Sequence, residues 1–423
     1  MLYFARGSKD DVITGNEVRT ILTQVFDSIG TKHRVLAIPP DFTRANSYAG
    51  PITEMVYDYF GSALTDVMPA LGTHVPMTEQ QISAMFGHTP SELFRVHDWR
   101  NDVVTVGEVP AEYIEKVSEG RLHYSWKAQV NKLLLEPDFD LILSIGQVVP
   151  HEVIGMANYT KNIFVGVGGA EGINRSHYLG ATYGMERIMG RAKSPVRDVM
   201  EYAARNFTSQ LPIVYIQTVL SKGDDGEMKL RGLFIGDDFE CFQKASDLAL
   251  QTNFIMLDRP IDKCLVWLDP EEFKSTWLGN KAIYRTRMAL ADNAELIVMA
   301  PALREFGEDK TIDSLIRKYG YRGTPATLKA VDENADLQAN LGAAAHLIHG
   351  SSEGRFTITY CPGPDMTRQE IEAVGFNYGN LDSMMDRYHP NGLKDGWNRT
   401  ADGEEFYYIS NPALGLWAYN LKP

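Results

Sequence analysis

The stretch FDLILSIGQVVP, residues 139–150, is the most strand-like segment in the first half of the chain, and His151 follows it directly. Around it, apolar runs of strand length alternate with segments of helical period, which is the pattern of layered α/β architecture. RVLAIPP (34–40) is another expected strand, and 67–74 is a further strand or extended segment. The sequence therefore predicts an α/β fold.

The helices expected between these strands have recognisable ends. Segment 52–64 carries an apolar stripe of helical period, and a helix begins after the capping residue Thr78 and ends at Gly87. The remaining elements expected before residue 253 are a strand over 163–169, helices over 178–190, 194–207 and 237–252, and a hairpin over 211–237 whose turn is KGDDGE.

A chain of 423 residues exceeds one ordinary core, so two α/β domains are expected, spanning 1–258 and 259–423. The pattern restarts around Pro260, which places the boundary. The second domain is expected to contain strands over 263–269, 294–302 and 354–361, helices over 280–292, 311–319 and 334–348, a helix from Arg368, and a terminal strand pair in 404–420 that packs on either domain.

Composition excludes several classes of protein. The formal net charge is -14, and no run of Lys and Arg is interleaved with aromatic residues, so neither nucleic acid nor a membrane is an expected partner. Because no secretory leader and no long apolar window is found, a cytoplasmic location is expected. Cys241, Cys264 and Cys361 are isolated from one another and are interpreted as buried apolar residues.

Candidate chemical groups follow directly after apolar strands. They are Asp41, Thr43 and Arg44 in PPDFTR, His74 in GTHVP, and His151 in VVPHE. In open α/β sheets ligands bind beyond the carboxyl ends of the strands, so this shared placement predicts a site. The same residue types also suit helix and turn caps, which is the structural alternative.

Lys161 and His177 flank a glycine-rich run, GVGGAEG, at 166–172. A dinucleotide fingerprint needs G-x-G-x-x-G, and Glu171 stands where the last small residue is required. The run therefore fits an NAD-dependent hydroxyacid dehydrogenase poorly. Two further alternatives are a hydrolase with zinc held by His74, His151 and His177, and a binding module without catalysis.

Taken together, the motifs closely resemble those of the nickel-dependent lactate racemase family. The resemblance is strongest between residues 39 and 180 and rests on DFTR (41–44), GTHVP (72–76), PHEVIG (150–155), Lys161 ten residues after His151, and His177 sixteen residues after that lysine.

This resemblance implies a two-domain α/β isomerase, a 2-hydroxyacid racemase or epimerase with its active site in the cleft between the domains. It implies nickel and a covalently bound nickel-pincer nucleotide, pyridinium-3-thioamide-5-thiocarboxylate mononucleotide, whose biosynthesis enzymes would be transient partners. By the family pattern Lys161 would carry the nucleotide and His177 would be the protein ligand of nickel. His74 and His151 would move the hydroxyl proton while the C2 hydride passes to the cofactor, leaving a 2-keto acid.

The same pattern implies that Arg44 binds the substrate carboxylate, and that Asp41, Thr43 and Tyr284 contact the cofactor. Two departures change these expectations. Where the family shows a serine, two glycines and an arginine before the lysine, this chain has Ala157, Asn158, Tyr159 and Thr160, so Asn158, Thr160 or backbone amides of the glycine run are expected to contact phosphate.

The second departure lies in the C-terminal domain. The glutamine and lysine that the family places on the substrate side align with Arg285 and Met288. Arg285, or the nearby Arg287, is expected to take over that contact. An additional arginine favours an acid larger than lactate, including a sugar acid whose C2 would be epimerised.

Overall fold

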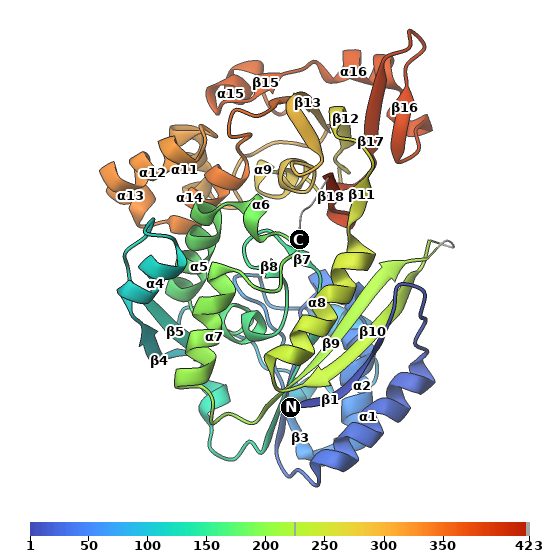
Figure 1. The fold of residues 1–423 in the computed structure, drawn as a ribbon, viewed down its shortest axis with the longest axis vertical. Helices are drawn as coiled ribbons and strands as arrows, with labels where there is room; N and C mark the ends of the chain where they lie inside the picture. The colour runs from blue at the N-terminus through green and yellow to red at the C-terminus, as the bar shows by residue number, and fades with distance from the viewer. Residues whose placement is uncertain (224–225, 420–423) are drawn as a thin grey trace. The chain divides into compact units, whose positions relative to one another are not determined.

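The computed structural model describes residues 1–223 and 226–419, and the chain divides into two compact units. Unit 1 comprises 1–183 and 187–253, and unit 2 comprises 184–186 and 254–423. Each unit is built on its own six-stranded sheet with helices around it (Figure 1). The predicted α/β class is confirmed.

The sheet of unit 1 has the strand order β1-β10-β9-β6-β2-β3. Strands β3, β2, β6 and β9 are parallel to one another, whereas β10 and β1 add an antiparallel edge. The strand bounds are β1 (Leu2–Gly7), β2 (Val35–Ile38), β3 (Leu64–Val67), β6 (Leu141–Gln147), β9 (Ile213–Lys222) and β10 (Met228–Gly236).

Helices cover this sheet, and small two-stranded sheets lie beside it. The helices are α1 (Gly15–Ile29), α2 (Ala49–Phe60), α3 (Glu79–Phe86), α4 (Ala111–Val117), α5 (Ala170–Tyr183), α6 (Met185–Ile188), α7 (Pro195–Phe207) and α8 (Phe239–Asn253), with short helical turns η1 (Phe42–Ser47), η2 (Gly61–Ala63), η3 (Ser91–Leu93), η4 (Lys132–Leu135) and η5 (Asn162–Gly166). The small sheets pair β4 (Val103–Val109) with β5 (Trp126–Asn131), and β7 (Pro150–His151) with β8 (Gly155–Met156).

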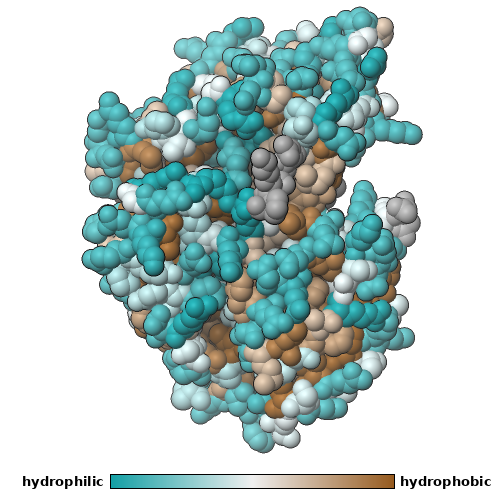
Figure 2. Space-filling view, viewed as in Figure 1, coloured by the Kyte–Doolittle hydropathy of each residue, from teal (hydrophilic) through white to brown (hydrophobic). Residues whose placement is uncertain are grey.

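The apolar runs read in the sequence are buried on both faces of the sheet. One face, including Val35 and Leu143, packs in a single core with residues of α1 and α2. Residues of the other face, such as Leu36 and Ile142, are also fully buried. Continuous apolar runs are the expected signature of strands covered on both sides. In Figure 2, hydrophilic residues cover most of the face in view, and hydrophobic residues gather in the lower part of unit 1.

Unit 2 also contains a six-stranded sheet, with the strand order β15-β14-β13-β12-β17-β16. Its neighbouring strands are parallel except for the pair β16 and β17. Its strands are β11 (Ile255–Leu257), β12 (Ile261–Trp267), β13 (Leu290–Ala300), β14 (Thr357–Pro362), β15 (Asn377–Tyr378), β16 (Gly396–Arg399), β17 (Glu405–Ile409) and β18 (Trp417–Tyr419). Its helices are α9 (Thr276–Gly279), α10 (Lys281–Tyr284), α11 (Lys310–Tyr319), α12 (Thr324–Glu333), α13 (Ala335–Gln338), α14 (Leu341–His349), α15 (Arg368–Ala373) and α16 (Leu381–Tyr388), with turns η6 (Pro390–Gly392) and η7 (Pro412–Leu414).

Three expected elements are corrected by the structure. Segment 163–169 is not a strand: its first residues belong to the π-helical turn η5, because a short apolar run alone does not distinguish a strand from a buried helical turn. The strand expected over 67–74 ends at Val67 as β3. The helix expected over 280–292 is the short α10, and strand β13 already begins at Leu290.

Other expectations match the observed elements closely. Helix α3 begins at the capping box of Thr78 and Gln81 and ends at Gly87, whose φ of +59° suits glycine. By contrast, the terminal strand pair expected in 404–420 is not a pair: β17 lies beside β12 and β18 beside β11, both in unit 2. The two aspartates of the expected hairpin turn lie outside the described residues. Among the described residues, no helix is long and apolar enough to cross a membrane.

Candidate functional site

The candidate site lies where the strand order of unit 1 reverses. From β2 the chain continues to β3 on one side, and it later returns to β6 on the other side of β2. Loops that leave the carboxyl ends of such neighbouring parallel strands diverge and open a crevice for ligands. Asp41 and Arg44 follow β2, and His151 follows β6, so three predicted site residues arise at this switch point.

Asp41 and His74 form a hydrogen-bonded pair. The Nδ1 atom of His74 lies 2.7 Å from Oδ2 of Asp41, and the hydroxyl of Thr43 donates to Oδ1 at 2.5 Å. Burial alone would raise the pKa of Asp41, but the bonds from His74 and Thr43 hold it below its usual value. A carboxylate can only accept, so Nδ1 of His74 carries a proton, and in the neutral ring Nε2 has a lone pair.

His151 has the opposite tautomer. The backbone N–H of Val153 donates to Nδ1 of His151 at 3.1 Å, so this nitrogen cannot carry a proton and Nε2 does. Burial holds the pKa of His151 well below its ordinary value, and the charges of Lys161, His177 and Arg44 act in the same direction. The neutral ring therefore presents an N–H donor, whereas His74 presents an acceptor.

Lys161 stands immediately before the π-helical turn η5, a type of local structure that recurs at functional sites. The side chain of Asn162 anchors this turn to the sheet, donating to the carbonyl of Ile38 at 3.1 Å and to the hydroxyl of Ser144 at 3.0 Å. Burial, followed by the charge of Arg44, lowers the pKa of Lys161 to about 8. A substantial fraction of this amine is neutral, and therefore nucleophilic, near physiological pH.

The backbone before Lys161 is strained. Asn158 and Tyr159 have φ angles of +67° and +59°, in the left-handed region that bulky residues rarely adopt. Arg197 of α7, a fully buried side chain, donates from its two terminal nitrogens to the carbonyls of Met156 and Asn158 at 2.7 and 3.2 Å and to the hydroxyl of Thr160 at 2.7 Å. Arg197 thus holds this segment in place.

His177 lies on α5, and Nδ1 donates to the carbonyl of Ile173 at 2.7 Å. This bond leaves Nε2 unprotonated, which is the state in which imidazole binds a metal, and bonds of this kind orient metal-ligating histidines in general. Burial lowers the pKa of His177, with the bond to Ile173 opposing it and the charge of Lys161 adding to it.

The predicted residues of unit 1 form one electrostatic neighbourhood. The charge of Lys161 lowers the pKa of both His151 and His177, and the charge of Asp41 acts on Lys161. The loop that carries His74 is tied to the lysine-bearing turn, because the N–H of Gly72 donates to the carbonyl of Gly166 at 2.8 Å. Glu152, which the sequence did not single out, adds a negative charge that acts on all three groups.

The glycine run packs tightly against the protein. A Cβ at Gly168 would collide with the carbonyl of Phe164, and one at Gly169 would collide with Gln129. His97 is buried and donates from Nε2 to the carbonyl of Gly168 at 3.0 Å. Because the run follows a π-helical turn rather than a strand, the strand–turn–helix context of a dinucleotide fingerprint is missing.

The two expected phosphate contacts of unit 1 already have partners in the protein. Asn158 donates from its side chain to the carbonyl of Gly146 at 2.8 Å. The hydroxyl of Thr160 accepts from Arg197 and donates to Glu201 at 3.2 Å. Their roles toward a cofactor stay predictions.

Unit 2 contains the remaining candidates, and the structure distinguishes between its two arginines. Arg287 is almost fully buried and paired with Glu186 at 2.6 Å. Arg285 has a buried Nε without a hydrogen-bond partner among the described residues, so it is better suited than Arg287 to bind an added group. Tyr284 is buried on α10. The contacts predicted for Tyr284 and Arg285 stay predictions.

A search of residues 1–223 and 226–419 finds no group of three or more His, Cys, Asp or Glu side chains placed to hold a metal ion. The zinc-hydrolase alternative requires such a group of three histidines. A nickel site that takes one protein ligand, with the other donors from a bound nucleotide, does not require one.

Three comparisons place the chain among known proteins. Residues 20–187 match the lactate racemase N-terminal domain. The lactate racemase of Thermoanaerobacterium thermosaccharolyticum is 29% identical over 149 residues, which are 34% of this chain and 32% of that protein. The match thus spans about a third of the length of this curated relative.

Two solved structures share the fold over almost the whole chain. A protein from Thermotoga maritima has a TM-score of 0.79 at 21% identity, covering 96% of this chain and 98% of the other. The lactate racemase apoprotein from T. thermosaccharolyticum has a TM-score of 0.70 at 15% identity, covering 98% of this chain and 94% of the other.

Fold and site together define an α/β protein of two units with a histidine- and lysine-containing site at the switch point of the first sheet. The resemblance to the lactate racemase family that the sequence motifs indicated is confirmed over residues 20–187, which match the lactate racemase N-terminal domain.

Proposed function

We propose that this protein is an isomerase that inverts C2 of a 2-hydroxy acid, either lactate or a larger acid such as a sugar acid. The observation that carries the proposal is the pair of histidines His74 and His151, whose Nε2 atoms have opposite protonation states beside a buried lysine. Inversion in both directions needs an acid–base group on each face of the substrate, and two histidines can supply one each.

The residues present fit a covalently attached nickel-pincer nucleotide. Lys161 has an amine with a pKa of about 8, and His177 has Nε2 free of a proton. We propose that Lys161 carries the nucleotide through an amide-type bond and that His177 ligates nickel, for which imidazole and sulfur are suitable donors. When bound, the group would supply a hydride acceptor for C2.

The chain's own residues would then orient the substrate and move its proton. His74, held by Asp41, accepts the hydroxyl proton at Nε2 for one enantiomer. His151 would hold the substrate oxygen through its Nε2–H in the resting state. After that proton moves to Nδ1, Nε2 would accept the hydroxyl proton of the other enantiomer, and the imidazolium so formed would return it. Arg44 adds a positive charge that acts on Asp41, His151 and Lys161, and a guanidinium suits the substrate carboxylate.

The test is production of the full chain together with the cofactor biosynthesis enzymes, followed by intact-mass measurement and chiral assay of 2-hydroxy acids. We expect a mass adduct on Lys161 and racemisation or epimerisation of at least one acid. The variant Lys161→Ala should lose both, whereas the matched control Lys116→Ala, an exposed lysine of α4, should keep both. An active Lys161→Ala enzyme, or an unmodified Lys161 in active protein, would contradict the proposal.

A further inference from the structure

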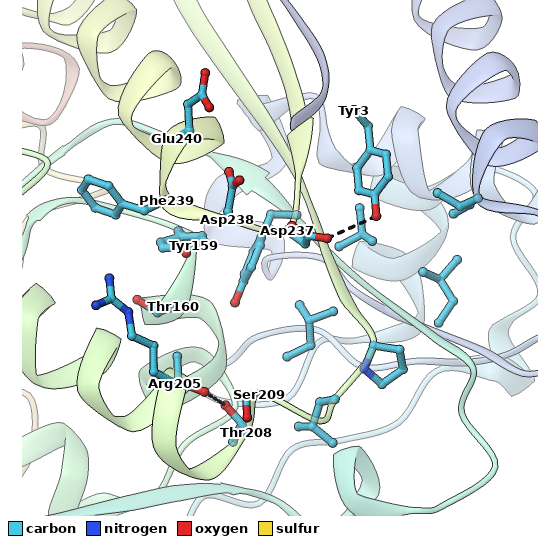
Figure 3. Close-up of a pocket in the computed structure, with 18 of the residues that line it drawn as sticks. Tyr3, Tyr159, Thr160, Arg205, Thr208, Ser209, Asp237, Asp238, Phe239 and Glu240 are labelled. Carbon is cyan, nitrogen blue, oxygen red and sulfur yellow. Dashed lines mark hydrogen bonds between the residues drawn. The ribbon is translucent and has the colours of Figure 1, made fainter. Parts of the chain in front are cut away.

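Unit 1 contains a cavity of about 780 Å³ at the edge of the sheet opposite the histidines. Leu141 and Ile213, the first residues of β6 and β9, line this cavity, whereas His151 follows the far end of β6. The lining includes none of the residues Asp41, Arg44, His74, His151, Lys161 and His177. The cavity thus lies at the other end of the sheet from the histidines and shares only Thr160 with the predicted site residues (Figure 3).

Two buried phenols of this cavity lack hydrogen-bond partners. Tyr159 and Tyr215 are only 4% and 5% exposed, and their rings lie 4.4 Å apart. Neither hydroxyl forms a hydrogen bond with any of the described residues. Burial raises the pKa of both phenols, so both keep their protons and can donate as well as accept. Neither oxygen is among the fully buried atoms without a partner, so both hydroxyls are open to the cavity, where a bound molecule could reach them.

A buried carboxylate lies on the same wall. The side chain of Glu201 is 12% exposed and accepts one bond, from Thr160 at 3.2 Å. Its nearest cation is Arg205, whose Nη2 is 3.9 Å away on a side chain that is 74% exposed. Burial raises the pKa of Glu201, with Arg197 opposing it. Three of the four hydrogen-bonding positions of this carboxylate are thus without a close partner among the described residues.

The charges of the residues that line the cavity favour a positively charged ligand. Five acidic residues line the cavity, Asp140, Glu201, Asp237, Asp238 and Glu240, against two basic residues, Lys32 and Arg205. Asp237 and Asp238 are already paired with the amino group of Met1. Asp140 accepts from the backbone amides of His33 and Arg34, and Glu240 pairs with Lys244 at 3.5 Å. Glu201 is therefore the carboxylate that can receive a new cation, and an anion would meet a net negative wall.

We propose that this cavity binds a small organic cation, a primary amine with an apolar body. The ammonium would donate to Glu201 and to the phenol oxygens of Tyr159 and Tyr215, pairing the polar groups that have no protein partner. The apolar body would lie along Ile29, Leu211 and Val214, which also line the cavity, and the tyrosine faces would add cation–π attraction.

Phenethylamine is a suitable probe, since it combines an ammonium with one ring. We expect saturable binding to the full chain by isothermal titration calorimetry, with a dissociation constant of about 1 mM or lower. Two molecules of similar shape are the ligand controls, the neutral 2-phenylethanol and the anionic 3-phenylpropionate. Neither should bind measurably at the same concentrations.

Three variants test the assignment. Glu201→Gln keeps the shape but removes the charge and should weaken binding about tenfold. Tyr215→Phe removes only a hydroxyl and should weaken binding severalfold, which keeps the test decisive if the glutamate variant folds poorly. Glu112→Gln, at an exposed position of α4 that does not line the cavity, is the matched control and should bind like the wild type. Equal binding of all three molecules, no saturable binding of the amine, or wild-type affinity in both Glu201→Gln and Tyr215→Phe would overturn the proposal.

Discussion

At the scale of single residues, the two histidines are set apart by their hydrogen bonds and not by their sequence surroundings. Asp41 holds the proton of His74 on Nδ1, and the amide of Val153 excludes a proton from Nδ1 of His151. We expect nitrogen NMR of the apoprotein to report a protonated Nδ1 in His74 and a protonated Nε2 in His151. The same tautomer in both rings would contradict the assignment.

Because Asp41 fixes the tautomer of His74, replacing Asp41 by asparagine should strongly reduce kcat. In Asp41→Asn the amide can donate to Nδ1, which would move the proton of His74 to Nε2 and remove the base. We expect kcat of the loaded enzyme to fall by about 100-fold or more, as wrong-tautomer variants of histidine bases do. Thr43→Val removes the other bond to Asp41 at 2.5 Å and should lower kcat only a few-fold. Steady-state kinetics in both directions would check this, and similar kcat values for the two variants would contradict it.

Lys161 should make the free energy of unfolding of the apoprotein depend on pH. Its pKa is lowered to about 8 from an ordinary value near 10.5, so the folded state disfavours the charged amine. Below about pH 8 the lysine is charged in both states and its full unfavourable contribution is present. Between about pH 8 and 10.5 the unfolded chain binds more protons, so this contribution fades as the pH rises.

The consequence is testable with the apoprotein. Lys161→Met should raise the free energy of unfolding at pH 7 by about 3 kcal/mol, and the gain should largely vanish near pH 10.5. Urea unfolding of both proteins at the two pH values measures the difference. Lys116→Met, at an exposed position of α4, should have no pH-dependent effect. A gain that stays constant with pH would mean that burial does not shift this lysine.

At the scale of elements, the backbone of the segment before Lys161 bears on one departure from the family pattern, the absence of two glycines. The two glycines of the family pattern correspond to Asn158 and Tyr159, and these are the two residues with left-handed φ angles. Glycine adopts such angles freely, whereas here contacts enforce them. Tyr159 stacks on Phe242 at 5.0 Å, and Arg197 donates to the backbone carbonyls of Met156 and Asn158. The backbone shape is thus one that two glycines would allow, although the side chains differ.

Arg197 is accordingly predicted to be a major stabilising residue of unit 1. Arg197→Met would leave the buried carbonyls of Met156 and Asn158 without donors, which should reduce the free energy of unfolding by about 3 kcal/mol or more. Arg205→Met, on the same helix but with a side chain 74% exposed, should change it by less than about 0.5 kcal/mol. Chemical denaturation of the two variants gives the comparison, and equal losses would refute the role assigned to Arg197.

The elements also show what the sequence could and could not predict. Strands β2 and β6 and helix α3 were predictable, because continuous apolar runs and a capping box are local signals. The π-helical turn η5 was not, since its apolar residues resemble a short strand. Asn162 and Arg197 carry no local signal either, because their partners lie far away in the sequence and are met only in the fold.

At the scale of the whole molecule, the strand order is what makes the separate motifs one site. Asp41 and His74 are 33 residues apart, and His151 follows another strand, yet the reversal of strand order between β2 and β6 brings their loops to one edge. The placement rule for open sheets predicted this much. Two features could not be predicted in this way: which nitrogen of each histidine carries the proton, and how Arg197 of α7 holds the segment before Lys161. Both depend on side-chain contacts that no spacing in the sequence encodes.

The complete holoenzyme offers a test that separates the two attachments proposed for its cofactor. Lys161 would hold the nucleotide covalently, whereas His177 would hold only nickel, through the Nε2 left free by its bond to Ile173. His177→Ala should therefore keep the mass adduct on Lys161 but retain nickel at least about tenfold less well, and Lys161→Ala should lose both. Intact-mass measurement and metal analysis of the same purified samples give the two readouts independently. If His177→Ala retained full nickel, the ligand would have to be another residue, and if it lost the adduct, the two attachments could not be separate.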